Sequence, residues 1–189
     1  MTTETLERAF ASTRQVLGNV KPDQLSDPSP CQSWTVREVI NHVIGGTFWF
    51  AASMNDGKAP AIPESDFTVG DMGATYDDGI KQAVAAFGAP GAMEKMVELP
   101  FGTFPGAAFI QLATTDAFTH GWDLAQATGQ STDLDPEVAK QLLEGARAFI
   151  QPALRGEDGK APFGREQQPP ANATAADKLA AFLGRTCES

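Results

Sequence analysis

Apolar side chains recur every three or four residues along six stretches of the chain, a spacing that places them on one face of an α-helix. In the first stretch, residues 3–20, Leu6, Phe10 and Leu17 share a face and Gly18 signals the end. The other stretches cover about residues 36–54, 73–88, 106–128, 136–151 and 175–183. The pattern therefore predicts four or five long helices, a short final helix and little strand.

Two of these helices have clear start signals. Thr35 and Glu38 have the spacing of a capping box, in which each side chain bonds to the backbone of the other residue. Asp135 is a favourable N-cap, and Pro136 suits the first helical position because its missing N–H is not needed there. We therefore expect helices to begin directly after Thr35 and Asp135.

Two segments lack a helical pattern. Residues 93–104 are interrupted by proline and glycine, which predicts either irregular structure or a short hairpin. Residues 152–173 are rich in proline and glycine and are expected to form an extended surface segment. The length suits a single domain over residues 1–189.

Composition narrows the partners of this chain. Its net charge is −10, which repels phosphate backbones, and no cluster of lysine and arginine offsets that field, so we expect no nucleic-acid partner. No apolar run approaches the roughly 20 residues that span a bilayer, so we expect no membrane partner and a cytoplasmic location. Cys31 and Cys187 are interpreted as two unrelated thiols, because disulfides are rare in the cytosol.

The chain has two histidines, and both lie in predicted helices. Asp116 and His120 are four residues apart and therefore share a helix face. His42 belongs to another helix, on the stripe that also carries Gly46 and Trp49 and should face the core. If His42 joins the pair, two imidazoles and one carboxylate could hold a metal with open coordination positions. The alternative is that each histidine is a packed, hydrogen-bonded core residue.

Neighbouring residues could support such a site. Asp123 follows His120 by three residues and could contact a ligand from behind or act as a fourth ligand, although a salt bridge or solvent exposure is the alternative. Trp34, Trp49 and Trp122 could wall a substrate pocket, or else pack in the core. Cys31 precedes a helix start and could be a reactive thiol, but a structural role is favoured.

Two segments carry a resemblance to a known family. Residues 30–43 (PCQSWTVREVINHV) and 116–129 (DAFTHGWDLAQATG) resemble the signature blocks of the DinB-like superfamily. They are most similar to the branch containing the N-terminal domain of mycothiol-dependent maleylpyruvate isomerase, and residues 177–185 resemble the end of its short actinobacterial members. The resemblance implies an all-α, DinB-like four-helix bundle, here with an additional C-terminal helix and a long Pro/Gly-rich connection.

The resemblance also implies a divalent metal held by His42, Asp116 and His120, with Asp116 standing where the isomerase has glutamate. Two histidines and a carboxylate suit catalytic zinc, which we favour, and also non-haem iron. Nickel is a third possible metal, because it ranks above iron and cobalt in affinity for such sites.

Related bundles use the metal to bind a low-molecular-weight thiol, so the implied function is a mycothiol S-transferase acting on an electrophilic small molecule. Isomerisation of maleylpyruvate is disfavoured, because the isomerase carries a second domain where this chain has a short helix. The alternatives are a non-enzymatic, stress-related metal-binding bundle and a helical interaction module without metal. A homodimer is a further expectation, because bundles of this type often pair through helix faces.

Overall fold

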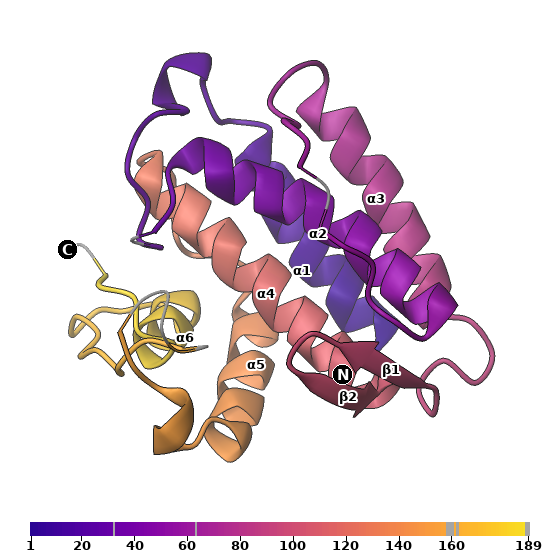
Figure 1. The fold of residues 1–189 in the computed structure, drawn as a ribbon. Coiled ribbons are helices and arrows are strands. Elements are labelled where there is room, and N and C mark those ends of the chain that lie inside the picture. The colour runs from indigo at the N-terminus through magenta and orange to yellow at the C-terminus, as the bar shows by residue number, and fades with distance from the viewer. Residues whose placement is uncertain (32, 63, 158–160, 162, 188–189) are drawn as a thin grey trace.

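A computed structural model describes residues 1–31, 33–62, 64–157, 161 and 163–187. Within these residues the chain is mostly helical and has one two-stranded sheet (Figure 1). The helices are α1 (Thr3–Leu17), α2 (Val36–Asp56), α3 (Met72–Phe87), α4 (Gly106–Ala127), α5 (Pro136–Phe149) and α6 (Ala175–Phe182). Short 3-10 helices cover Pro22–Gln24 and Pro152–Leu154, and the strands are β1 (Met96–Leu99) and β2 (Gly102–Pro105).

The helix starts follow from their capping residues. The Thr35 backbone N–H donates to the Glu38 carboxylate at 2.7 Å, and the Glu38 N–H donates to the Thr35 hydroxyl at 3.4 Å, so the expected capping box is confirmed. Asp135 accepts from the N–H groups of Glu137 and Val138 at the start of α5, as an N-cap should. Helix α2 runs two residues beyond the predicted end, because Gly57 adopts a left-handed conformation (φ 73°) and terminates it there.

Four helices enclose the main core. Each of α1 and α2 packs against both α3 and α4 (Figure 1). Buried aromatic side chains of these helices belong to one core cluster. Gly121 allows α4 to approach α1 closely, because a Cβ atom there would overlap the side chain of Thr13. Gly79 likewise allows α3 to approach α2 closely, because a Cβ atom there would overlap the side chain of Thr47. Helices α5 and α6 pack on each other and on α4.

The expectation of an all-α fold needs one correction. Residues 96–105 form a hairpin in which Met96 pairs with Pro105 and Leu99 with Gly102. Its buried residues, Val97 and Leu99, alternate with exposed ones, so one face of β1 packs on the core. This is the hairpin alternative for residues 93–104, and its second strand leads directly into α4.

The Pro/Gly-rich connection, where the structure describes it, is partly buried and does not lie only on the surface as expected. Leu154 and Phe163 pack against the core, and Arg155 pairs with Phe163 in an isolated bridge. Residues 158–160 and 162, also covered by that expectation, lie outside the described residues. Gly164 and Gly184 meet backbone to backbone, where a Cβ on either would collide with the other. This crossing holds the residues after α6 against the segment around Gly164.

No helix in the described part of the chain is both long and apolar enough to cross a membrane.

Candidate metal centre

Helices α2 and α4 bring the two histidines and Asp116 together. His42 Nε2 lies 3.0 Å from Asp116 Oδ1 and 3.2 Å from Oδ2, although 74 residues separate them. His120 Nε2 lies 3.7 Å from the same Oδ1, and the two imidazole rings are 4.6 Å apart between centroids. One ligand atom from each residue can be chosen so that all three lie within 4.8 Å of one another. The convergence that the sequence left to helix packing is therefore present.

These separations fit a metal of ordinary size. Bonds of about 2.0–2.1 Å in a tetrahedral arrangement put two ligand atoms about 3.3 Å apart. The observed 3.0 Å and 3.7 Å between histidine nitrogens and Asp116 lie on either side of that value. Small side-chain rotations would admit an ion, and Asp116 reaches the histidines despite being shorter than glutamate.

Asp123 fixes the orientation of His120. Its Oδ2 atom lies 2.9 Å from His120 Nδ1 and the Asp123 side chain is fully buried. Burial raises the pKa of Asp123, but Arg185 and His120 lower it by more, so the group is held below its usual range. An ionised Asp123 can only accept, so His120 Nδ1 donates to it, and Nε2 is the ring nitrogen that remains to bind a metal. This is the contact from behind that supports a metal-binding histidine.

Arg185 completes this arrangement and was not foreseen from the sequence. Its Nε donates to Asp123 Oδ1 at 3.1 Å, and a terminal nitrogen donates to Oδ2 at 3.0 Å. The Arg185 side chain is 16% exposed, so the pair is largely shielded from water. Of the two alternatives to a supporting role for Asp123, a salt bridge is therefore present, and solvent exposure is not.

Asp116 and His42 perturb each other in the absence of a metal. Burial raises the pKa of Asp116, but the two histidines and Arg185 outweigh it and lower that pKa to about 2. Burial lowers the pKa of His42, and the Asp116 carboxylate raises it by more, leaving it above its usual value. The pair therefore favours a proton on His42, at the position that a divalent cation would take.

The three tryptophans occupy different places. The Trp34 ring lies 4.7 Å from the His42 ring and 5.3 Å from the His120 ring, covering both imidazoles. Trp49 lines a cavity next to them. Trp122 instead is buried in the core on another face of α4, where its indole N–H donates to Asp177 at 2.9 Å. It does not line the cavity.

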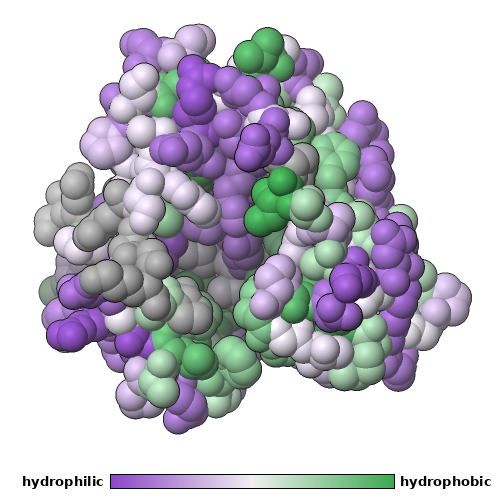
Figure 2. Space-filling model, in the orientation of Figure 1, coloured by the Kyte–Doolittle hydropathy of each residue, from purple (hydrophilic) through white to green (hydrophobic). Residues whose placement is uncertain are grey.

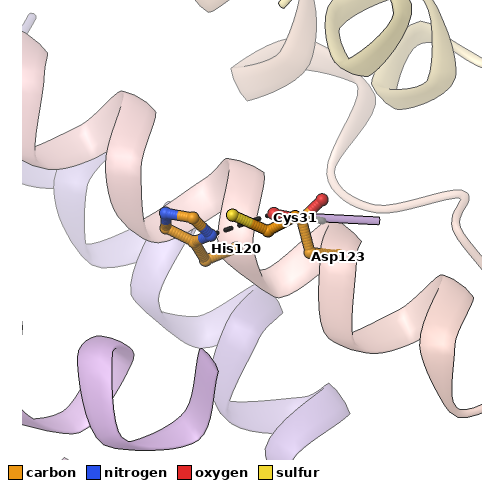
Figure 3. A group of neighbouring side chains, drawn as sticks. All are labelled: Cys31, His120 and Asp123. Carbon is orange, nitrogen blue, oxygen red and sulfur yellow. Dashed lines mark hydrogen bonds and ion pairs between the residues drawn. The ribbon is translucent and has the colours of Figure 1, made fainter. Parts of the chain in front are cut away.

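Cys31 forms a second cluster with His120 and Asp123 (Figure 3). Its sulfur lies beside the His120–Asp123 hydrogen bond, and the three ligand atoms lie within 4.8 Å of one another. A cation there would have to replace the proton on His120 Nδ1 and compete with the Arg185 guanidinium for Asp123. The chemistry of these donors therefore suits a metal less well than His42, Asp116 and His120 do.

A cavity of about 730 Å³ opens beside the three residues. In Figure 2 the surface is hollowed between the C-terminal segment and the hairpin, on the face formed by α2 and α4. The polar end of the cavity contains His42, Asp116, His120, Thr119 and Arg185. The rest of its wall is mostly apolar and comes from α2 and the loop after it, the hairpin, α4, the segment that begins at the end of α5, and the residue after α6. Such a volume suits a small-molecule ligand.

The chain is a mostly helical protein in which two histidines and a carboxylate on facing helices could hold a metal ion. Comparison with known proteins identifies its family. The family described as the mycothiol maleylpyruvate isomerase N-terminal domain, a DinB-like helical domain, matches residues 6–125, and the chain belongs to it. The resemblance noted in the sequence is thereby confirmed.

Among curated proteins, the chain is similar to two uncharacterized proteins from two strains of Mycobacterium tuberculosis. Each is 45% identical over 184 residues, which cover 95% of this chain and 95% of the relative. No solved structure matches the chain significantly. The family implies a mycothiol-related, metal-associated activity, and the clusters above are residue groups able to hold a metal.

Proposed function

We propose that His42, Asp116 and His120 bind a divalent metal, with zinc favoured, and that the chain is a thiol S-transferase using mycothiol. The observation that supports this most strongly is the geometry of the three residues. Two Nε2 atoms and one carboxylate converge at the polar end of a cavity and leave the cavity side open. Three protein ligands with an open position are typical of catalytic rather than structural zinc.

The charges around the site favour an anionic fourth ligand. With both histidines neutral, Asp116 cancels one of the two charges of a divalent cation, and Asp123 and Arg185 cancel each other. A net single positive charge therefore remains in a partly buried place, and a thiolate would neutralise it. A bound divalent cation supplies this chemistry by lowering the pKa of a coordinated thiol.

The residues of the chain hold and orient the reactants. Trp34 covers the two imidazoles and restricts the ligand side to the cavity. Asp123 does not serve as a general base in this proposal, because it is fully buried and already accepts from His120 and Arg185. The electrophile would enter from the apolar side of the cavity.

A non-enzymatic metal-binding role is the competing proposal. It would be favoured if Asp123 closed the coordination sphere as a fourth ligand. Its engagement with His120 Nδ1 and with Arg185 disfavours that closure. The two proposals therefore differ in whether a thiol gains access to the metal.

The first test is the metal content of untagged protein purified without a nickel column. We expect about one metal ion per chain, with zinc most abundant, and its loss in His42→Ala and Asp116→Asn. Asp78→Asn is the matched control, because Asp78 is an exposed carboxylate paired with Lys81 on α3. Equal metal content in all four proteins, or none in any, contradicts the ligand set.

The second test measures loss of the thiol group when mycothiol is mixed with an activated aryl halide. The wild-type protein and Asp78→Asn should consume the thiol, and Asp116→Asn should not. Full metal content without consumption of thiol, over a panel of electrophiles, would support the non-enzymatic role instead.

A further inference from the structure

The cavity beside the proposed metal centre is polar at one end only. His42, Asp116 and Arg185 lie at that end. The remainder is lined mainly by aromatic and aliphatic side chains, which come from α2 and the loop after it, the hairpin, α4, the segment that begins at the end of α5, and the residue after α6. A ligand that fills this volume must present mostly apolar surface to it.

The apolar lining continues onto the outside of the protein. Among the described residues, five large hydrophobic side chains are strongly exposed, and three of them line this cavity. These are Ile62, Phe101 and Phe149, at 74%, 65% and 51% exposure. They come from three different segments, so their meeting at one mouth is a property of the fold. Apolar side chains left in water at this mouth would gain from contact with a ligand that extends outward.

Thr119 contributes a buried hydroxyl to the cavity wall. Thr119 is 6% exposed and its hydroxyl has no hydrogen-bond partner among the described residues. It lines the cavity directly before His120 in the chain. A buried hydroxyl without a partner costs free energy, and a ligand with a carbonyl or hydroxyl group at its inner end would remove that cost.

We propose that this cavity binds an elongated, mainly apolar small molecule whose inner end carries a hydrogen-bonding group for the Thr119 hydroxyl. Its alkyl or aryl body lies along Phe104, Phe109 and Leu112 and reaches the exposed side chains at the mouth. The identification of this molecule as the electrophile of the transfer reaction rests on the proposed function. Its binding depends on neither the thiol nor turnover.

The experiment measures binding of straight-chain methyl ketones of increasing length to the full chain as purified, by calorimetry or through tryptophan fluorescence. Each ketone offers one acceptor oxygen near one end and an alkyl chain of variable length. Affinity should rise about fourfold for each added methylene, until the chain emerges from the mouth. An affinity independent of chain length, or the absence of binding by every member, overturns the proposal.

Variants with matched controls locate the ligand. Ile62→Ser and Phe101→Ser should lower the affinity for the longest ketones several-fold and leave the affinity for the shortest ketones unchanged. Val69→Ser and Met96→Ser are the controls, because Val69 and Met96 are similarly exposed, at 78% and 55%, but do not line the cavity. Equal effects of the two pairs would overturn the proposal, because the ligand would then not lie at this mouth.

The inner end is tested with Thr119→Val, which keeps the shape and removes the hydroxyl. All ketones should lose affinity by the same factor, about two- to twelvefold for one hydrogen bond. An unchanged affinity would overturn the assignment of Thr119. If ketone affinity rises with chain length but no thiol transfer is found, only the proposed function is contradicted. If thiol transfer is found but ketone affinity does not depend on chain length, only this inference is contradicted.

Discussion

Replacing Asp123 with asparagine should weaken metal binding without removing any proposed ligand. The amide oxygen of asparagine can still accept from His120 Nδ1, so the imidazole keeps its direction. The negative charge that makes this imidazole a better electron donor is lost. Removal of such a carboxylate behind a metal-binding histidine weakens metal affinity about 10- to 100-fold. We therefore expect Asp123→Asn to make the free energy of metal binding less favourable by about 1.4–2.7 kcal/mol.

The same substitution should also lower the free energy of unfolding. Asp123 is fully buried and Arg185 is 16% exposed, so the substitution leaves a largely shielded guanidinium without its carboxylate. Breaking one partner of a buried pair costs about 3–5 kcal/mol, and the partial exposure of Arg185 places this case near the lower end. The effect on metal affinity must therefore be separated from the effect on stability.

Asp177→Asn provides that separation. Asp177 is a buried carboxylate of α6 that accepts from the Trp122 indole and from the Thr174 N–H, but it does not contact either histidine. Competition against a chromophoric chelator, at a temperature where both variants are folded, gives their metal affinities. Asp123→Asn should bind more weakly and Asp177→Asn as the wild type. Equal affinities for the two variants would refute the role assigned to Asp123.

Three further predictions concern the scaffold and the metal-free site. Thr35→Ala should lower the free energy of unfolding by about 0.5–2 kcal/mol in urea denaturation, because the capping box of α2 is lost. Gly121→Ala should cost about 1–3 kcal/mol although alanine favours helix, because its Cβ would overlap Thr13; an unchanged stability would contradict this close approach. In metal-free protein, the raised pKa of His42 contributes stability that is lost as pH rises above about 6.5, and the lowered pKa of Asp116 contributes stability that is lost as pH falls from about 4 toward 2. The thermal unfolding temperature of the metal-free protein should therefore be highest between about pH 4 and 6.5. Asp116→Asn should lack this dependence on pH.

The helices could be predicted because their signals are local. The capping box of Thr35 and Glu38 lies within four residues, and the i, i+4 spacing of Asp116 and His120 fixes their shared face. The meeting of His42 with this pair depended on how α2 packs against α4. The apolar stripe containing Gly46 and Trp49 indicated the direction of His42, but only the structure supplies the 3.0 Å contact with Asp116.

Other parts of the site had no local signal. Arg185 contacts Asp123 across 62 residues, and the lone arginine after α6 has no pattern that marks its partner. Trp122 illustrates the opposite difficulty. It is two residues from His120, and a separation of two on a helix turns the side chain to another face, toward Asp177. Closeness in sequence to a histidine was therefore a poor guide to the pocket.

The Arg185–Asp123 contact joins the segment after α6 to the helix that carries two of the proposed ligands. All three proposed ligands lie within residues 6–125, the part that matches the family, and Arg185 lies outside it. A change at Arg185 alters the charge environment of Asp123, and through it the donor strength of His120, while the ligands stay the same. Substitutions in the segment after α6 would therefore change how tightly a metal is held without altering the residues that hold it.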